Sequence, residues 1–579
     1  MHPRTLKHNP VSQEVETLAG KYDHDPKALL EILQEIQHSE GYLTPERIAE
    51  VGRSLRIPQH QVQGIATFYT MLNTAPQAGN TLRICDSPAC WLRAAAELRE
   101  YAENTLGSNW TVTRNSCLGL CDRAPAALVN NEQWGPLNRL GLDSLLATAG
   151  THSPNPDYTD PRPGEARVML ANAGKIDPTS LESALTFGAY RALAMALGKG
   201  ESTALPVSPK TIIKTVETAG IRGRGGAGFP VGRKWSFVAA EARTPKYVVC
   251  NADESEPLVF KDRVLMETNP QQLLEGMALA AYAVGAEEGF IYIRGEYEDQ
   301  AQLLENAIAQ AENSGYLGEN ILDSDFSFHV HVHRGAGAYI CGEESALLES
   351  LEGKRGEPRM RPPYPVTSGY LGQPTVVNNV ESLAMVPHIV LNGADWYRGL
   401  GNPHAPGTKI YTLLGHVKHP GLFEAPLGLT LREVIEHFGG GMQHGSEFQF
   451  ALTGGAAGTI VPSDLLDVPI DYDSQKKGVS LGAGAFLICD KTVSPVALLR
   501  ELLHFFEVES CGKCTPCRVG TREAREILDR LAAGEGKPED YVHLAHLAET
   551  LEKTSFCGLG QSAAWPIKSA FVHFRPAFG

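Results

Sequence analysis

The segment spanning residues 223–235 constrains the fold of this chain more than any other stretch. It places five glycines, three cations and two aromatic rings within thirteen residues. Glycine lets the backbone approach a ligand closely and expose its N–H groups, cations offset phosphate charge, and aromatic side chains flank a ring. The segment therefore predicts a loop that holds a phosphate-bearing planar cofactor, and the alternative is a glycine-rich surface loop.

The glycine spacing of this segment also matches the dinucleotide fingerprint G-x-G-x-x-G, at Gly223, Gly225 and Gly228. That fingerprint requires a strand before it and a helix after it. Residues 211–220 instead have the pattern of a short helix ended by glycine. We therefore expect a nucleotide-binding loop of a kind other than the Rossmann turn.

Length and composition restrict the class of protein. A chain of 579 residues is too long for one core, and about three to five domains are expected. The net charge of −16 argues against nucleic acid or an anionic membrane as the main partner. The chain has no long apolar run, and its first residues lack the apolar core of a signal peptide. We expect a cytoplasmic protein without direct membrane insertion.

The N-terminal quarter of the chain has two patterns. Residues 1–75 are predicted to form a helical segment, because apolar residues recur at helical spacing. Residues 76–150 combine short strands at 81–85, 110–114 and 126–129 with one helix near 94–104, which is typical of a small α/β domain. Residues 151–164, rich in proline and aspartate, are predicted to be a linker.

Residues 165–405 alternate between helices and strands, as in an α/β layer fold. A strand at 246–250 runs into residues 251–257, which places three carboxylates and an amide where open α/β sheets gather ligands. A second strand enters Gly335-Ala-Gly337 and then a helix whose first turn holds Glu343 and Glu344. Carboxylates at a helix start are often surface charges, so for these two both a ligand role and a surface role stay open.

The C-terminal third divides into two domains. Residues 406–490 are predicted to be a compact β-rich domain in which Thr430 and Glu433 form a capping box. Residues 491–579 are predicted to be helical. The alternating histidines His329, His331 and His333 occupy one strand face; a polar strand face is favoured over a metal site for them.

Two sets of four cysteines indicate metal centres. Cys511, Cys514 and Cys517 have C-x-x-C-x-x-C spacing, and Cys557 can complete the four thiolates of a [4Fe-4S] cluster. A four-cysteine zinc site usually has two separated C-x-x-C knuckles, so it is the weaker alternative.

The N-terminal set consists of two pairs, Cys85 with Cys90 and Cys117 with Cys121. Four thiolates suit a [2Fe-2S] cluster as well as zinc, and their spacing alone does not decide between them. The other cysteines, Cys250, Cys341 and Cys489, lie in apolar surroundings and are predicted to be core residues.

With these residues assembled, the chain resembles the NADH-oxidising module of respiratory complex I and its relatives. Residues 1–150 resemble the 24-kDa-type subunit, with a helical segment and a thioredoxin-like [2Fe-2S] domain. The rest resembles the 51-kDa-type flavoprotein. The resemblance rests on five motifs in the same order, at residues 223–235, 251–257, 335–344, 374–382 and 509–518.

This resemblance implies a multidomain α/β fold. Its parts are a helical plus thioredoxin-like N-terminal region, an FMN- and NAD-binding α/β domain at 165–405, a β-grasp-like (SLBB) domain at 406–490 and a C-terminal helical bundle with a [4Fe-4S] cluster at 491–579.

The resemblance also implies the residues that hold the cofactors. FMN is expected to contact Gly223, Arg224, Gly225, Gly226, Gly228, Lys234, Asn251, Asp253, Glu254, Tyr339, Gly342, Asn378 and Asn379. NADH is expected to stack on the flavin, with Phe229, Phe237, Glu256, Glu344, Arg361 and Tyr364 around it, and Glu343 is a further cofactor-binding candidate. Glutamates near the nicotinamide ribose would repel the extra phosphate of NADP, which favours NAD. No catalytic side chain is expected beyond the positioning provided by Glu256 and Glu344.

The sequence departs from the family pattern at a few positions. Ser255 stands where many relatives have glycine, and Leu258-Val259 where they have Gly-Thr. Arg361 and Tyr364 replace a lysine and a phenylalanine, which keeps the charge and the ring but changes their geometry. We expect activity to survive these changes.

The implied chemistry belongs to the cofactors. Hydride passes between nicotinamide and flavin, single electrons pass to the C-terminal cluster, and the [2Fe-2S] centre serves as a relay or electron store. Because all four N-terminal cysteines are present, whereas hydrogenase fusions can lack some of them, we expect the β subunit of an NAD-dependent formate dehydrogenase. Its partner would be a molybdenum- or tungsten-containing α subunit. The alternatives are the diaphorase of an NAD-reducing hydrogenase, a complex I-like quinone reductase, a bifurcating enzyme that uses ferredoxin, and a non-catalytic zinc scaffold.

Overall fold

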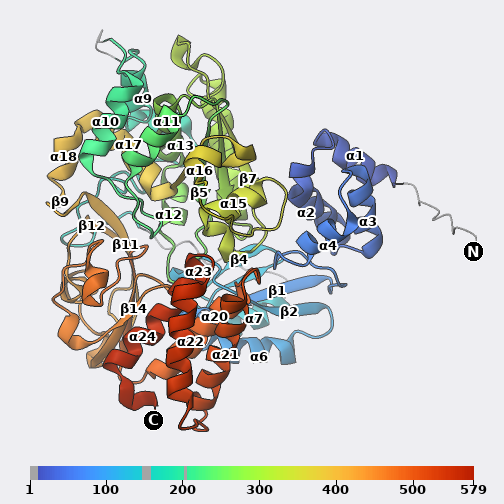
Figure 1. The fold of residues 1–579 in the computed structure, drawn as a ribbon, viewed down its shortest axis with the longest axis vertical. Helices are drawn as coiled ribbons and strands as arrows, with labels where there is room; N and C mark the ends of the chain where they lie inside the picture. The colour runs from blue at the N-terminus through green and yellow to red at the C-terminus, as the bar shows by residue number, and fades with distance from the viewer. Residues whose placement is uncertain (1–10, 147–157, 201–204, 579) are drawn as a thin grey trace, which may run out of the picture.

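The computed structural model describes residues 11–146, 158–200 and 205–578. The N-terminal lobe consists of four helices and stands beside the main body (Figure 1). Ser12 and Thr44 cap two of these helices with their hydroxyl oxygens, and Pro45 occupies a first helical position that needs no N–H donor. The predicted helical segment is confirmed, with helices α1 (Gln13–Lys21), α2 (Leu29–Glu40), α3 (Pro45–Ser54) and α4 (Gln59–Ala66).

The next domain has a four-stranded sheet in the order β2-β1-β3-β4. Its elements are β1 (Asn80–Cys85), α5 (Pro88–Trp91), α6 (Ala95–Thr105), β2 (Trp110–Asn115), β3 (Ala127–Val129), β4 (Glu132–Trp134) and α7 (Arg139–Leu146). The sequence analysis missed β4. It pairs with β3 through a two-residue turn at Asn130 and Asn131, which both have positive φ, as this tight hairpin turn requires.

The predicted linker is partly a packed strap. Residues 151–157 lie outside the described residues, but Tyr158 donates a hydrogen bond to Asp122 over 2.7 Å. Arg162 donates to the carbonyl oxygens of His419, Phe438 and Pro420 over 2.6, 2.9 and 2.8 Å. This part of the predicted linker therefore packs against both the thioredoxin-like domain and the β-rich domain.

The central domain is built on a parallel sheet of four strands in the order β7-β6-β5-β8. The strands are β5 (Tyr247–Ala252), β6 (Glu288–Ile293), β7 (His329–Arg334) and β8 (Thr375–Asn379). Since β5 comes first and β8 last in the chain, the strand order reverses between these two neighbours. Ligands of open parallel sheets bind at the carboxyl ends of the strands at such a switch point, so β5 and β8 mark where a site belongs.

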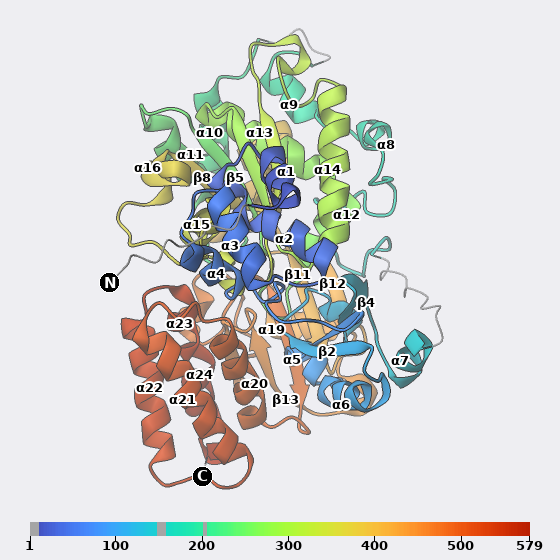
Figure 2. The same cartoon turned by 90° about the vertical axis from the view of Figure 1, so that its right-hand side faces the viewer.

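Helices cover this sheet on both faces (Figure 2). The helices of this domain are α8 (Leu181–Thr186), α9 (Arg191–Ala196), α10 (Pro209–Ala219), α11 (Val231–Ala240), α12 (Lys261–Thr268), α13 (Pro270–Val284), α14 (Glu298–Asn313), α15 (Glu344–Leu351), α16 (Pro365–Ser368), α17 (Val380–Asn392) and α18 (Ala394–Arg398). Almost all of α13 is buried. A short hairpin of β9 (Gly401–Asn402) and β10 (Ala405–Pro406) follows.

The β-rich domain has a five-stranded sheet in the order β12-β11-β15-β13-β14 and its own apolar core. Its strands are β11 (Thr408–Gly415), β12 (Gly421–Pro426), β13 (Phe448–Thr453), β14 (Thr459–Val461) and β15 (Ala485–Asp490). The predicted capping box is confirmed: Thr430 and Glu433 bond reciprocally at the start of α19 (Leu431–Glu433).

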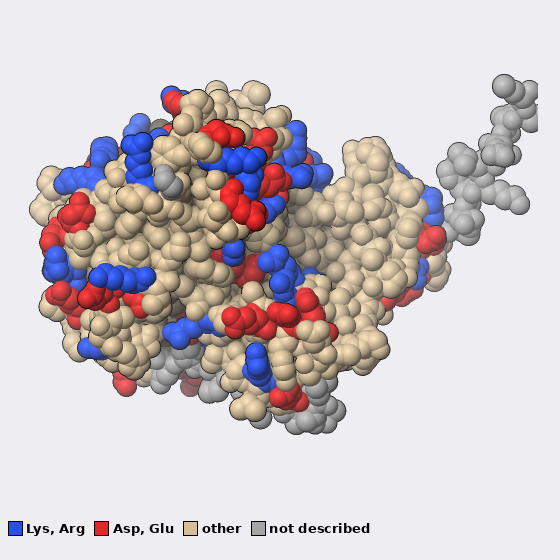
Figure 3. All heavy atoms as spheres, turned by 90° about the horizontal axis from the view of Figure 1, so that it is seen from below, with Lys and Arg blue, Asp and Glu red and all other residues tan. Residues whose placement is uncertain are grey.

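The C-terminal bundle packs below the central sheet, with α20 (Pro495–Val508), α21 (Thr515–Ala532), α22 (Asp540–Thr554), α23 (Gly558–Ser562) and α24 (Ala564–His573). Among the described residues, no helix combines the length and apolarity needed to cross a membrane. On the face seen in Figure 3, basic and acidic side chains are intermixed rather than segregated.

Candidate functional site at the carboxyl ends of β5 and β8

The glycine-rich loop connects two helices, α10 and α11, so it is not a Rossmann turn and the prediction is confirmed. The N–H of Gly223 donates to the carbonyl of Phe229 over 2.9 Å and closes the loop. Gly226 and Gly228 have φ of +114° and +65°, which glycine adopts without strain. A Cβ atom on Gly225 would lie 3.3 Å from the Cβ of Asn379. The loop is thus pressed against the end of β8.

The first turn of α11 carries a cation, Lys234, at this end of the sheet. The Nζ of Lys234 lies 2.9 Å from Glu344 and donates to the carbonyl of Val377 over 2.9 Å. The neighbouring Trp235 is buried, and its indole N–H donates to Asn378 over 2.8 Å. The structure therefore brings together three elements that the sequence singled out separately.

The end of β5 supplies an amide and a buried carboxylate. Asn251 donates to the carbonyl of Gly342 over 2.8 Å. One oxygen of Asp253 accepts from Ser255 over 2.6 Å, while the other is buried without a partner among the described residues. Burial raises the pKa of Asp253 to about 7. A buried polar atom without a protein partner is what a site for a hydrogen-bonding ligand provides, so the residues here fit a bound flavin.

Glu256 joins the central domain to the β-rich domain. The hydroxyl of Tyr339 donates to one carboxylate oxygen, and the N–H of Ala457 donates to the other over 2.8 Å. Burial raises the pKa of Glu256 to about 7. The N–H of Tyr339 in turn donates to Glu509, two residues before Cys511, over 2.8 Å.

A polar and aromatic surface flanks this site. Glu343 caps α15 by accepting from the N–H groups of Ser345 and Ala346, each over 3.0 Å. Arg361 lies 3.2 Å from Glu343 and 3.6 Å from Glu344. Three aromatic side chains stay accessible to a stacking ligand, namely Phe229 at 43%, Phe237 at 42% and Tyr364 at 54% exposure.

The geometry revises the roles expected for two charged side chains, Arg224 and Glu254. The guanidinium of Arg224 is buried and donates to Tyr472, Tyr397 and Thr408 over 2.6, 2.7 and 2.8 Å. The carboxylate of Glu254 accepts from the first N–H groups of α12, at Asp262 and Arg263, over 2.8 and 2.9 Å. Both side-chain charges are thus bonded within the protein, and so are the N–H of Arg224, which donates to the hydroxyl of Ser382 over 2.9 Å, and the carbonyl of Glu254, which accepts from Arg294 over 2.6 Å.

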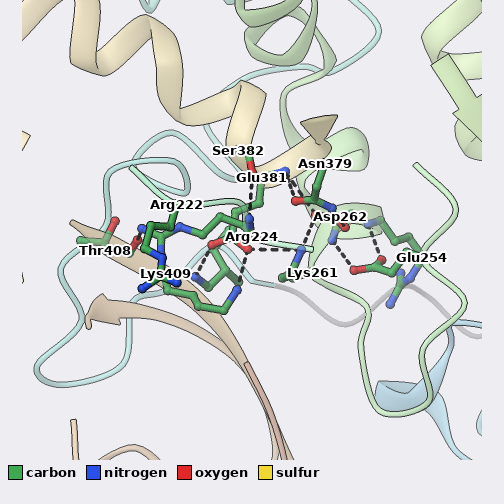
Figure 4. A network of polar contacts seen from close by, with 12 residues as sticks. Arg222, Arg224, Glu254, Lys261, Asp262, Asn379, Glu381, Ser382, Thr408 and Lys409 are labelled. Carbon is green, nitrogen blue, oxygen red and sulfur yellow. Dashed lines mark hydrogen bonds and ion pairs between the residues drawn. The ribbon is translucent and has the colours of Figure 1, made fainter. Parts of the chain in front are cut away.

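A buried chain of charges lies behind the site (Figure 4). Glu381 accepts from Lys409 over 2.9 Å, lies 3.2 Å from Lys261 and also accepts from the N–H of Ile410 over 3.0 Å. Asp262 binds Lys261 at 2.6 Å and accepts from Asn379 over 2.6 Å. Lys261, Glu381 and Lys409 were not predicted from the sequence, because each lies in an element whose pattern is that of ordinary core or surface. Tertiary packing brings Lys261 to Glu381, and the contact with the β-rich domain adds Lys409.

The four C-terminal cysteines line one cavity. Cys511, Cys514, Cys517 and Cys557 enclose it together with apolar side chains such as Ile340 and Phe556. Cys514 and Cys557 each stand directly before a helix, α21 and α23. Four cysteines around one enclosed space fit the donor set of a [4Fe-4S] cluster.

The four N-terminal cysteines are buried and converge from three elements. Cys85 ends β1, Cys90 lies on α5, and Cys117 and Cys121 lie between β2 and β3 with their sulfurs 3.4 Å apart. The predicted core cysteines Cys250, Cys341 and Cys489 are also buried.

The strand-face histidines have carboxylate partners. His329, His331 and His333 lie 3.2, 2.7 and 2.7 Å from Glu319, Glu288 and Glu31. This agrees with the polar strand face that was favoured. In the described ranges, no three His, Cys, Asp or Glu side chains are arranged to hold one metal ion directly; an iron–sulfur cluster is held through several iron atoms instead.

Four family models match the chain in the predicted order. They are the thioredoxin-like [2Fe-2S] ferredoxin at residues 15–149, the Nuo51 FMN-binding domain at 216–388, the SLBB domain at 410–458 and the NADH-ubiquinone oxidoreductase-F iron-sulfur binding region at 497–579. The predicted fold class, FMN and both clusters are thereby confirmed.

Curated proteins and solved structures are similar over long stretches. An NADH-quinone oxidoreductase subunit of Rhizobium meliloti is 47% identical over 71% of this chain and 96% of its own length. The NADP-reducing hydrogenase subunit HndC of Solidesulfovibrio fructosivorans is 43% identical over 71% of this chain and 82% of its own length. A crystal structure of an NAD+-reducing [NiFe]-hydrogenase in the H2-reduced state matches with a TM-score of 0.82 and 32% identity, covering 96% of this chain and 93% of that chain.

Proposed function

We propose that this chain, which belongs to the family of the FMN-binding Nuo51-type subunits of NADH-quinone oxidoreductase, is the NAD(H)-reacting subunit of a larger electron-transfer assembly. The chain is an NADH:acceptor oxidoreductase flavoprotein with iron–sulfur clusters. The observation that carries the proposal is the convergence of Lys234, Glu344, Asn251 and Asp253 at the switch point between β5 and β8, next to the exposed ring of Phe229.

Within this proposal the residues divide between two ligands. The glycine loop and Lys234 hold the phosphate of FMN, while Asn251, Asp253 and Asn378 bond its polar ring edge. Phe229, Phe237 and Tyr364 offer faces for the adenine and nicotinamide of NAD(H), with Arg361 and Glu344 beside them. The bound flavin supplies the chemistry that converts a hydride into single electrons. Glu256 and Glu344 position the rings.

The two cysteine sets carry the electrons onward in this proposal. Cys511, Cys514, Cys517 and Cys557 hold the [4Fe-4S] cluster, and Cys85, Cys90, Cys117 and Cys121 hold the [2Fe-2S] cluster. Since Tyr339 bonds both Glu256 and Glu509, one residue links the flavin site to the segment that leads into the C-terminal set.

A hydrogenase or a quinone reductase is the better supported parent assembly. The likeness to the NAD+-reducing [NiFe]-hydrogenase chain extends over 96% of this chain, whereas the Rhizobium relative matches 71% of it. The formate dehydrogenase α subunit that we expected as partner has no comparable support among these relatives. The cytoplasmic location stays a prediction.

An anaerobic NADH titration of the purified chain tests the proposed function. Visible absorption and EPR follow the flavin and the clusters, and FMN, iron and zinc are assayed in the same sample. We expect bleaching of the flavin, two kinds of reduced-cluster signal and about six irons per chain. A zinc-loaded protein that does not react with NADH contradicts the proposal.

A pair of cysteine variants tests the ligand assignment. In Cys557→Ala the [4Fe-4S] signal should be lost while the [2Fe-2S] signal stays. In Cys489→Ala, whose sulfur is fully buried in β15, both signals should stay. Loss of both signals in Cys489→Ala, or retention of both in Cys557→Ala, would refute the assignment.

A further inference from the structure

Two buried arginines of the central domain hold the loop between Cys117 and Cys121. The Nε of Arg263 donates to the carbonyl of Gly119 over 3.1 Å, and its Nη2 donates to both oxygens of Asp122 over 2.8 and 2.7 Å. Arg294 donates to the carbonyl of Cys117. Arg263 and Arg294 are 0% and 3% exposed, so neither is a surface charge.

Arg294 also contacts the strand end that belongs to the flavin site. Its Nη1 donates to the carbonyl of Glu254 over 2.6 Å, two residues beyond the end of β5. One planar guanidinium thus bonds a carbonyl beside a proposed cluster ligand and a carbonyl of the proposed flavin site. Glu296 lies 2.8 Å away and pairs with the charge.

The loop fits closely onto the central domain at this point. Gly119 has φ of +70°, and a Cβ atom there would lie 2.0 Å from the hydroxyl oxygen of Tyr297. That hydroxyl donates to Glu254 over 3.3 Å, and Glu254 is also part of the buried network drawn in Figure 4. A side chain at position 119 would force Tyr297 or the cysteine loop to move, so this loop packs directly against the central domain.

We propose that Arg294 is a positioning residue that fixes the [2Fe-2S] loop to the flavin site and raises the reduction potential of that cluster. A fixed positive charge stabilises the more negative, reduced state of a nearby centre. Because Arg294 and Glu296 are both buried, salt screens them little. Loss of Arg294 leaves the negative charge of Glu296 without a counter-charge and should lower the reduction potential of the cluster. Loss of the Glu296 charge should raise it.

This inference rests on the proposed assignment of Cys117 as a cluster ligand, and four variants of the full chain test it. Arg294→Gln removes the charge, Arg294→Lys keeps the charge but cannot bond both carbonyls with one planar fork, and Glu296→Gln removes the counter-charge. Arg334→Gln is the matched control, because Arg334 ends the neighbouring strand β7 and pairs with Glu298 and Glu305 at the surface.

The measurement is an EPR-monitored redox titration of both clusters in the loaded chain. In Arg294→Gln we expect the reduction potential of the [2Fe-2S] cluster to become more negative. At a fixed solution potential, the ratio of reduced to oxidised [2Fe-2S] cluster should fall about tenfold. Arg294→Lys should shift less, Glu296→Gln should shift to more positive values, and Arg334→Gln should match the unaltered chain. The [4Fe-4S] potential should stay constant throughout.

Two results would overturn the inference. One is an unshifted [2Fe-2S] potential in Arg294→Gln with a full signal; the other is an equal shift of both clusters, which would indicate general distortion. If Arg294→Gln does not accumulate as folded protein, Glu296→Gln serves as the test. A [2Fe-2S] potential in Glu296→Gln that is not more positive than in the unaltered chain overturns the inference. A missing [2Fe-2S] signal in the unaltered chain would instead reject the cluster assignment itself.

Discussion

The residues at the switch point between β5 and β8 include both buried carboxylates and a cation. Asp253 and Glu256 are buried carboxylates with pKa values raised to about 7 by burial, whereas Lys234 keeps a cation beside Glu344 and the end of β8. A site that holds a phosphate on one side and polar ring atoms on the other needs both kinds of group. The contribution of Lys234 can therefore be measured directly as a change in FMN affinity.

Replacing Lys234 with methionine should weaken FMN binding. The change keeps much of the apolar stem and removes the charge, and the loss of a charge-assisted hydrogen bond corresponds to about a tenfold or larger rise in the dissociation constant. Flavin fluorescence on the reconstituted chain measures it. Arg233→Met is the control, because the guanidinium of Arg233 lies over the ring of Phe237, 5.5 Å from its centroid. This substitution should change the dissociation constant of FMN less than about twofold, against about tenfold for Lys234→Met. Equal affinities in the two variants would contradict the assignment.

Glu275 gives the chain a predictable pH dependence. It is buried on α13, accepts from the N–H groups of Ala192 and Leu193 over 2.8 and 3.1 Å, and burial raises its pKa to about 7. Between its ordinary value of 4.5 and about 7 the folded chain keeps a proton that the unfolded chain has lost. Stability from this group is therefore present at low pH and lost as the pH rises through about 7.

Glu275→Gln should remove that part of the pH dependence. The amide oxygen can still accept both hydrogen bonds and never carries a charge. Relative to the variant, the unaltered chain should lose about 2 to 3 kcal/mol of unfolding free energy between about pH 5 and pH 8. Chemical denaturation at both pH values measures the difference. The prediction fails if the two proteins have parallel pH profiles.

At the scale of elements, close helix contacts determine where the site lies. Helix α13 crosses α17, the helix that follows β8 and the flavin-site asparagines. A Cβ atom on Gly276 of α13 would lie 2.1 Å from the carbonyl oxygen of Leu383. The glycine therefore sets how near α17, and with it the end of β8, can approach the core.

Gly276→Ala should destabilise the chain by about 2 kcal/mol or more, because overpacking forces backbone shifts. Gly64→Ala is the matched control on helix α4, where the nearest atom to the new methyl is 3.8 Å away; it should stabilise by about 0.5 to 1 kcal/mol. Thermal unfolding of both variants measures the contrast. Stabilisation by both substitutions would show that the α13–α17 contact can relax.

At the scale of the whole molecule, buried charges join the domains. Glu381 on α17 binds Lys409 of the β-rich domain and lies beside Lys261 of α12. All three are at most 1% exposed. The β-rich domain is thereby attached directly behind the glycine loop, whose Arg224 reaches the same interface.

Glu381→Gln should loosen the β-rich domain, because it leaves the buried ammonium group of Lys409 without its counter-charge and removes one of the two carboxylates beside Lys261. Breaking a buried pair costs about 3 to 5 kcal/mol. Limited proteolysis and calorimetry should show an earlier transition and cleavage within residues 406–490. Asp473→Asn, which breaks the exposed pair with Lys476, should leave both measurements unchanged. An intact, unshifted transition in Glu381→Gln would refute this role.

The elements themselves could be predicted well from the sequence. Helical periodicity indicated the helical N-terminal segment in which α1–α4 lie, the strand at 246–250 became β5, and the Thr430 capping box formed as expected. Local signals suffice where backbone propensity and hydrophobic pattern agree. The hairpin strand β4 was missed because three residues are too few to carry a period, and the strap at Tyr158 was missed because proline and aspartate suit a linker and a packed segment equally.

The sequence by itself determined which donor groups the chain offers: two sets of four cysteines, a glycine loop with cations and the carboxylates after β5. The spacing of the N-terminal cysteines did not decide between iron–sulfur and zinc, because four thiolates suit both. Only the tertiary structure decided which of these side chains are bonded within the protein. Arg224 and Glu254 carry the right charges in the right motifs, yet their side chains turn toward Tyr397 and α12. The link from Arg294 to Cys117 spans 177 residues, and no local pattern encodes such a contact, because it depends on how separately folding units pack together.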